Sequence, residues 1–161
     1  AGAVGGCVAN PYKDNPPVFV VVEAEAAACL YKGAAAGDGK PRIVDGDMQT
    51  IMAGLACGEP NTISWDILKN HVKMFVAAPD WVAAQGMRML GAPIKGDPAI
   101  TSGESGAAPF GALSVLMTSD DCADVRKELG LDETANVLVF STEGDTDPQR
   151  YKNIVWKGLD K

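Results

Sequence analysis

The stretch from Val137 to Pro148, VLVFSTEGDTDP, predicts a strand, a turn and the start of a helix. Val137 to Phe140 is an unbroken apolar run that is too short for a helix and is typical of a strand buried on both faces of a parallel sheet. Gly144 permits a tight turn, Asp147 is a good N-cap, and Pro148 suits the first helical position, where its missing N–H is not needed. Ligands of open α/β sheets bind at the carboxyl ends of strands, so this turn is a candidate ligand edge.

Two hydroxyl residues, Ser141 and Thr142, follow this predicted strand directly. Their place at the carboxyl end of a strand makes both candidates for contacting a cofactor. The alternative is that the two hydroxyls only cap the turn, as Ser and Thr often do. The pattern alone leaves both interpretations open.

The rest of the chain alternates between predicted strands and helices. Short apolar runs predict further strands at residues 18–22, 42–44 and 72–77. Helical patterns are found at residues 1–9, 24–31, 50–56, 64–72, 79–90, 107–117, 119–129 and 148–156. Glu23 is expected to end the first strand, and Ser64 to cap a later helix. The glycines Gly33, Gly37 and Gly39 are expected to stop the helix that follows the first strand. The alternation predicts an α/β fold with an open, mostly parallel sheet and helices on both faces.

Composition narrows the class of protein. The chain has 161 residues, of which 22% are charged, and its formal net charge is -7. An acidic balance without runs of Lys and Arg argues against nucleic acid as a partner. No apolar run approaches the length of a membrane span, and nothing resembles a signal peptide. These features predict a soluble, cytoplasmic protein of one domain.

The cysteines and the single histidine do not form a metal-binding pattern. Cys7, Cys29, Cys57 and Cys122 are widely spaced without a CxxC motif, and His71 is the only histidine. We therefore expect no metal site. If any two cysteines lie within disulfide reach we expect Cys29 and Cys57, with the reduced state favoured in a cytosolic setting.

Three glycine-bearing turns fall where predicted elements end: AGLACGEP at 53–60, SGESGA at 102–107 and STEGDTD at 141–147. Glu104 in the second turn is either a site residue or a carboxylate that complements the positive end of a helix dipole. No Walker or dinucleotide-binding pattern is present. Glycines at the start of the chain, Gly2 among them, fit the tail of a phosphate-binding loop, and helix packing explains them equally well.

Several unusual strings recur in the order found in one family. AACLYKGAAAGDGKP, TIMAGLACGEPN, PDWVAAQGMRMLG, SGESGA and STEGDTDPQRYKNIVWKG resemble the C-terminal part of diaminopropionate ammonia-lyase. That family is a pyridoxal-phosphate (PLP) enzyme family of the tryptophan synthase beta-chain fold type, also called fold type II. The resemblance covers nearly the whole chain. It implies that residues 1–161 are the C-terminal portion of the large, PLP-binding domain, and that the upstream half is absent.

The resemblance also implies roles for particular residues. Ser141 corresponds to the hydroxyl that meets the pyridine nitrogen of PLP, and Glu104 to the acidic residue beside the ring. Gly54 matches the loop on the substrate side, while Thr142 and Gly2 are further candidates for cofactor contact. A neutral hydroxyl at the ring nitrogen leaves the pyridine largely unprotonated, which favours β-elimination.

Family chemistry would convert 2,3-diaminopropionate into pyruvate and ammonia. In this family the Schiff-base lysine and the proton-moving residues lie upstream of the position matching Ala1, and no lysine here sits in a matching motif. We therefore assign no nucleophile and no base. The expected partners are a small amino-acid substrate, the upstream half of the same subunit and a second copy in a homodimer. The chain alone is expected to be inactive.

Two other functions remain open at this point. One is a related dehydratase acting on serine or threonine, against which STEGDTD and GEPN argue. The other is a non-catalytic α/β module that binds a phosphate ligand or a partner protein, because such folds host many functions.

Overall fold

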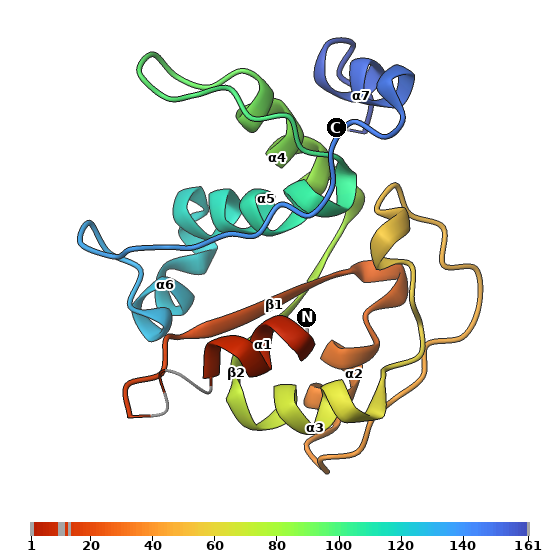
Figure 1. Ribbon diagram of the computed structural model, residues 1–161, viewed down its shortest axis with the longest axis vertical. Coiled ribbons are helices and arrows are strands. Elements are labelled where there is room, and N and C mark those ends of the chain that lie inside the picture. Colours follow the sequence, from red (N-terminus) through yellow and green to blue (C-terminus); the bar gives the residue numbers. More distant parts are fainter. Residues whose placement is uncertain (1, 10–11, 13, 161) are drawn as a thin grey trace. The chain divides into compact units, whose positions relative to one another are not determined.

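The computed structural model describes residues 2–9, 12 and 14–160, and the chain divides into two compact units (Figure 1). Unit 1 comprises Ala1–Gln49 and Leu55–Ala77, and unit 2 comprises Thr50–Gly54 and Ala78–Lys161. Each unit has its own set of buried apolar side chains.

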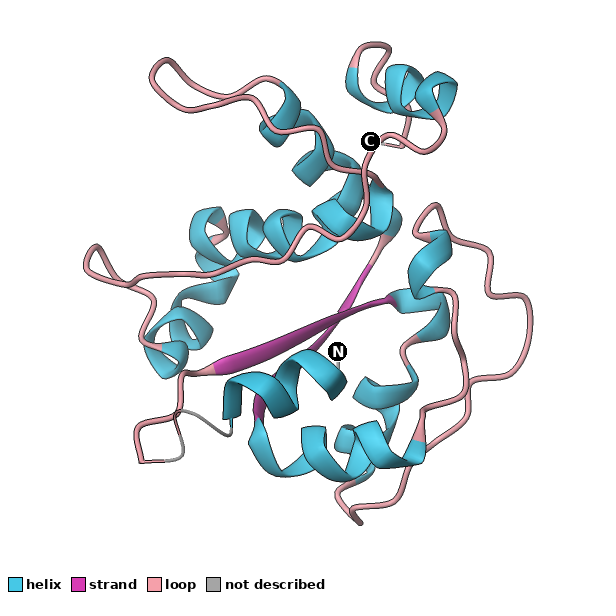
Figure 2. Ribbon diagram, in the orientation of Figure 1, coloured by secondary structure: helices cyan, strands magenta, loops and turns pink. Residues whose placement is uncertain are grey.

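Unit 1 combines a two-stranded sheet with helices (Figure 2). Its elements are α1 (Gly2–Ala9), β1 (Phe19–Ala24), the 3-10 turn η1 (Glu25–Ala27), α2 (Cys29–Ala36), α3 (Thr62–His71) and β2 (Val72–Ala78), whose last residue belongs to unit 2. The predicted strands at 18–22 and 72–77 are thus confirmed with small shifts of their ends. β1 and β2 pair with each other, and α1 packs on α3.

Trp65 forms the centre of the unit 1 core. Its ring lies against Gly33, where an added Cβ would come within 2.9 Å of the indole, and 6.1 Å from the ring of Phe75. The indole N–H donates to the carbonyl oxygen of Gly39 over 2.9 Å. Of the three glycines expected to stop this helix, Gly37 ends α2 with a φ of 69°, whereas Gly33 lies inside the helix. Gly33 instead makes room for the indole.

The sequence suggested that Glu23 ends β1. This prediction is wrong, because Glu23 lies buried within the strand. Its carboxylate accepts hydrogen bonds from the backbone N–H groups of Leu30 (3.0 Å) and Tyr31 (2.7 Å) in the first turn of α2. The N-cap residue of α2 is Ala28, which has no acceptor in its side chain. Glu23 therefore does the work of an N-cap from the neighbouring strand, and burial raises its pKa above the ordinary 4.5.

Cys29 and Cys57 meet beside this carboxylate. The Cys29 thiol donates to the Cys57 carbonyl oxygen at 3.4 Å and approaches Glu23 Oε1 at 3.7 Å. Burial and the nearby carboxylate raise the pKa of the Cys29 thiol to about 11. Both cysteines are free thiols in this structure, and the reduced state stays a prediction.

Unit 2 is helical. It contains α4 (Asp80–Gly91), α5 (Glu104–Thr118), the 3-10 turn η3 (Asp120–Cys122), α6 (Ala123–Leu129) and α7 (Pro148–Val155). The 3-10 turn η2 (Ala53–Leu55) begins in unit 2 and ends in unit 1. In this unit α4 packs on α5 and α7, and α5 packs on α6. α6 ends at Gly130, whose φ is 67°, and α7 begins with the expected Asp147 cap and Pro148.

The α4 and α5 backbones approach closely because small residues line their contact. An added Cβ at Gly86 would lie 2.5 Å from the carbonyl oxygen of Ala107, and one at Gly111 would overlap the carbonyl of Val82. Farther along, Gln85 Nε2 donates to Ser114 Oγ at 2.8 Å. Neither glycine can accept a side chain unless the two helices separate.

Four further local predictions are wrong. Val137 to Phe140 is an extended segment outside any strand, drawn as a loop in Figure 2, and Leu138 is 76% exposed. A strand needs a partner for its backbone groups, and in the described part of the chain only β1 and β2 pair. Residues 42–44 likewise form no strand, and 50–56 contains only η2. Asn61, rather than Ser64, caps α3, because its Oδ1 accepts from the Ser64 N–H.

Replacing Gly111 by alanine should destabilise unit 2 by more than about 2 kcal/mol, since the added methyl group forces backbone apart rather than a flexible side chain. Chemical denaturation followed by circular dichroism measures the loss. Gly144→Ala is the matched control, because an added Cβ there meets nothing within 4 Å. Equal stability of the two variants would show that the helix contact tolerates a methyl group.

Replacing Glu23 by glutamine should change how stability depends on pH. Below pH 4.5 the carboxyl is protonated in both folded and unfolded chains. As the pH rises from there through the raised folded-state pKa, the unfolded chain loses its proton first, so the wild-type free energy of unfolding falls relative to that of Glu23→Gln.

Urea unfolding of both proteins at a series of pH values gives this difference. Glu25→Gln removes a charge from an exposed position two residues further along and serves as the control. A constant difference between wild type and Glu23→Gln above pH 4.5 would contradict the burial of an ionisable carboxyl.

Candidate functional site

The turn that follows Val137–Phe140 lies against the N-terminus of α5. The Gly103 N–H donates to the carbonyl oxygen of Glu143 at 2.9 Å. An added Cβ at Gly103 would overlap the carbonyl oxygen of Gly144, so the two segments are in backbone contact. Two of the three glycine-bearing turns identified in the sequence, SGESGA and STEGDTD, therefore lie side by side.

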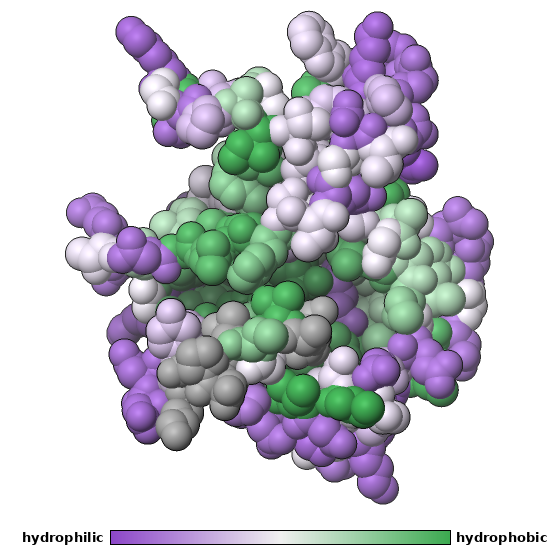
Figure 3. Space-filling model, viewed as in Figure 1, coloured by the Kyte–Doolittle hydropathy of each residue, from purple (hydrophilic) through white to green (hydrophobic). Residues whose placement is uncertain are grey.

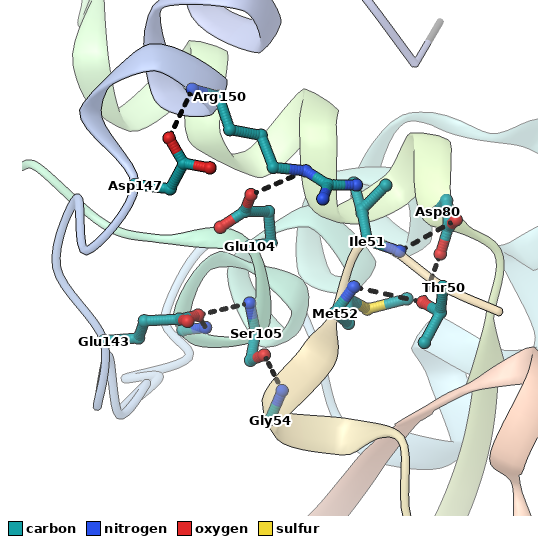
Figure 4. A network of polar contacts seen from close by, with 11 residues as sticks. Thr50, Ile51, Met52, Gly54, Asp80, Glu104, Ser105, Glu143, Asp147 and Arg150 are labelled. Carbon is teal, nitrogen blue, oxygen red and sulfur yellow. Dashed lines mark hydrogen bonds and ion pairs between the residues drawn. The ribbon is translucent and has the colours of Figure 1, made fainter. Parts of the chain in front are cut away.

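Glu143 caps α5 from this turn (Figure 4). The N-cap residue Gly103 has no side chain, and Glu143 Oε2 accepts instead from the N–H groups of Ser105 (2.7 Å) and Gly106 (3.3 Å). These are the helix positions that an N-cap side chain normally satisfies, and a carboxylate there also complements the helix dipole. The cap holds the STEGDTD turn at the start of the helix.

Ser141 and Ser102 form a hydroxyl pair within this contact. Their Oγ atoms are 2.7 Å apart. Ser141 is exposed, whereas Ser102 is 0% exposed. Ser141 Oγ also lies 3.4 Å from the carbonyl oxygen of Glu143, and the neighbouring Thr142 is exposed. The pair thus consists of one accessible hydroxyl, that of Ser141, which is hydrogen-bonded to the buried hydroxyl of Ser102.

Glu104 occupies the first turn of α5 and forms an ion pair with Arg150. Glu104 Oε1 lies 3.2 Å from Arg150 Nε, and the side chains are 12% and 48% exposed respectively. Asp147 caps α7 by accepting from the Arg150 N–H at 3.0 Å, which fixes the turn that carries the arginine. The position of Glu104 also complements the helix dipole, so both interpretations of this residue fit the geometry.

The segment from Thr50 to Gly54 is tied to the starts of α4 and α5. The Gly54 N–H donates to Ser105 Oγ at 3.0 Å. The Thr50 hydroxyl and the Ile51 N–H, the latter at 3.1 Å, both donate to the Asp80 carboxylate in the first turn of α4. This segment therefore carries Gly54 to the same helix start as Glu104 and Ser105 (Figure 4).

Among the predicted cofactor residues, Ser141, Thr142, Glu104 and Gly54 all lie at or next to the first turn of α5. Gly2 is the first residue of α1 in unit 1. The sequence pattern pointed to no role for Ser102, Ser105 or Arg150, which organise this turn together with Glu143, and for Glu143 it favoured a solvated or capping carboxylate. One signal for these residues was available in the sequence. A helix whose N-cap is glycine has free N–H groups in its first turn, and these groups require an acceptor from another segment.

Within residues 2–9, 12 and 14–160, no group of three or more His, Cys, Asp and Glu side chains is arranged to hold a metal ion. In the same part of the chain, no helix has both the length and the apolar character that a membrane span requires.

Comparison with known proteins gives consistent results, although no family model matches the chain. The chain is 49% identical over 159 residues to diaminopropionate ammonia-lyase of Salmonella typhimurium and 45% identical over 160 residues to that of Escherichia coli. Each alignment covers 98% of this chain but 39% of the relative. The resemblance drawn from the motifs is confirmed, and the chain spans about two fifths of the length of these relatives.

Solved structures agree with the sequence comparison. The Escherichia coli diaminopropionate ammonia-lyase in complex with D-serine superimposes with a TM-score of 0.89 at 41% identity, covering 99% of this chain and 39% of that one. The same enzyme in complex with an aminoacrylate-PLP azomethine reaction intermediate gives a TM-score of 0.86, with the same identity and coverage. Maize serine racemase gives 0.70 at 18% identity over 98% of this chain and 44% of that chain, which shows the fold alone. The predicted α/β fold class is thereby confirmed.

Removing the Glu143 carboxylate should loosen the helix start. We expect Glu143→Ala to lower the free energy of unfolding by about 1 to 2 kcal/mol, because two N–H groups of α5 lose a charged acceptor. Asp145→Ala removes the same charge from an exposed position in the same turn and is the control. Amide hydrogen exchange at Ser105 and Gly106 should quicken only in the Glu143 variant, and unchanged protection there would contradict the cap.

Proposed function

We propose that this chain is the C-terminal part of a diaminopropionate ammonia-lyase and that residues 1–161 form a portion of its PLP-binding domain. The observation that carries the proposal is 49% identity along 98% of the chain. The match to 39% of the relative's length supports an upstream part in the same subunit. In this proposal the complete enzyme removes the β-amino group of 2,3-diaminopropionate by α,β-elimination and yields pyruvate and ammonia.

The residues of the α5 start fit the pyridine ring of PLP. Ser141 presents a neutral, accessible hydroxyl backed by Ser102, and its hydrogen bonds within the described residues go to the Ser102 hydroxyl and the Glu143 carbonyl oxygen. Such a group suits an uncharged ring nitrogen. When bound, PLP supplies the electron-withdrawing ring that acidifies the α-proton of an amino acid.

The side chains then have separate tasks. Ser141 would donate a hydrogen bond to the ring nitrogen, with Thr142 next to it. Glu104, whose carboxylate is fixed by Arg150, would lie beside the ring. Gly54, held by Ser105, brings backbone to the substrate side without a side chain in the way.

The catalytic lysine and the base belong to the upstream part in this proposal. The apolar segment Val137–Phe140 supports such a division. Val137, Leu138 and Phe140 are exposed, and Figure 3 shows hydrophobic side chains on the surface around α5. An extended apolar segment without a strand partner suits a sheet completed by other strands of the subunit. We further propose a cytoplasmic homodimer that serves amino-acid catabolism.

The dehydratase alternative has weaker support, since the STEGDTD and GEPN strings argue against it. A non-catalytic module has no specific observation in its favour. Assays with serine, threonine and diaminopropionate would separate the two enzymatic functions.

The test compares the 161-residue chain with the same chain joined to an upstream segment that supplies a Schiff-base lysine and a phosphate loop. The joined protein should bind PLP with a visible absorbance band and release pyruvate from diaminopropionate, whereas the chain alone should do neither. Ser141→Ala in the joined protein should weaken PLP binding about fivefold to tenfold, the equivalent of one hydrogen bond. Asp145→Ala is the control, and enzyme-like turnover by the chain alone would contradict the proposal.

A further inference from the structure

We propose that Ser102 is a positioning residue whose buried hydroxyl donates to Ser141 Oγ and so turns the Ser141 proton outward, toward the ring nitrogen of the cofactor. The inference rests on the proposed function. It gives a role to Ser102, to which the motif resemblance assigns none. It also states which of the two serines donates the hydrogen bond between them.

The distances favour a strong bond between the two serines. Ser102 Oγ lies 2.7 Å from Ser141 Oγ and 3.3 Å from the carbonyl oxygen of Gly103. Bonds between a hydroxyl and an oxygen are typically about 2.7 to 2.8 Å long and weaken beyond about 3.0 Å. The Ser102 proton therefore has one good acceptor, which is Ser141 Oγ, and one poor acceptor.

The proton count gives the direction. Each hydroxyl has one proton, and the bond between the serines uses one of the two. If Ser141 donated, the Ser102 proton would be left with the long contact to Gly103 in a place that water does not reach. If Ser102 donates, the remaining proton belongs to Ser141, which is exposed and whose nearest other acceptor, the Glu143 carbonyl oxygen, is 3.4 Å away. The buried Ser102 hydroxyl thus donates to the exposed Ser141 hydroxyl.

Gly106 keeps the pair in place. An added Cβ at Gly106 would lie 2.9 Å from Ser102 Oγ and 3.0 Å from Ser141 Oγ. Both hydroxyls therefore rest on the backbone of α5, which the Glu143 cap holds in turn. The orientation of the pair is built into the helix start before any ligand arrives.

The consequence concerns the protonation of the ring nitrogen. An unprotonated ring nitrogen only accepts hydrogen bonds, and a protonated one only donates. A Ser141 hydroxyl that already accepts from Ser102 is a better donor, because chains of hydrogen bonds polarise one another. Ser102 therefore favours the unprotonated ring nitrogen through Ser141.

The experiment uses the full-length protein that carries this chain, loaded with PLP isotopically labelled at the ring nitrogen. NMR of that nitrogen across a pH series gives its apparent pKa. We expect Ser102→Ala to raise this pKa by about one unit, a tenfold change in the protonation equilibrium, and to raise the dissociation constant of PLP severalfold. Ser102→Cys, with a weakly donating thiol, should shift the pKa in the same direction, and it replaces the alanine variant if that variant does not fold.

Ser114→Ala is the matched control. Ser114 is also a buried hydroxyl, within α5, with partners at Gln85 and Gly111. Its loss should reduce stability without moving the ring-nitrogen pKa.

Three results would overturn the proposal in distinguishable ways. If Ser141→Ala moves the pKa and Ser102→Ala behaves as Ser114→Ala does, Ser102 has no positioning role. If Ser102→Ala lowers the pKa, the bond between the serines runs in the opposite direction. If neither Ser102→Ala nor Ser141→Ala has an effect, Ser141 does not meet the ring nitrogen, and that part of the proposed function fails as well.

Discussion

Free backbone N–H groups at the start of a helix must find acceptors, and the candidate site depends on how α5 meets this requirement. Its N-cap is Gly103, and the acceptor is the carboxylate of Glu143, which lies 38 residues after Ser105. Because the same bonds fix the STEGDTD turn, the hydroxyl pair and the ion pair of Glu104 follow from them. Unit 1 uses the same device at α2, where Ala28 is the N-cap and Glu23 of β1 provides the acceptor. Both glutamates connect a helix start to a segment outside that helix.

The body of α5 is fixed by a second constraint, the close contact with α4. Gly86, Ala107 and Gly111 let backbone meet backbone, so the position of the helix is set by sterics rather than by long interlocking side chains. A rigidly placed helix is a good support for a site, since its first turn then has a defined position. Asp80, in the first turn of α4, similarly anchors the segment that carries Gly54.

Local signals in the sequence predicted much of the fold. Asp147 with Pro148, and Gly130 after Leu129, marked helix ends correctly because these residues act through their own backbone. The prediction failed where the deciding partner is remote. Val137 to Phe140 has the composition of a strand, yet strand formation requires a paired neighbour, and composition does not reveal whether one is available. Glu23 looked like a polar residue ending a strand, since the N–H groups that justify its burial belong to α2. The motifs located the α5 start, but the contribution of Ser102 became visible only through its distance to Ser141.

The packing of Trp65 also has a spectroscopic consequence. Trp65 is 2% exposed in unit 1 and is surrounded by Gly33, Gly39 and Phe75, whereas Trp156 in unit 2 is 82% exposed. A buried indole emits at shorter wavelength than one in water and is shielded from soluble quenchers such as iodide. The intrinsic fluorescence of the chain therefore has a shielded component from unit 1 and a quenchable component from unit 2. A red shift of the shielded component reports the opening of the Trp65 core without any attached label.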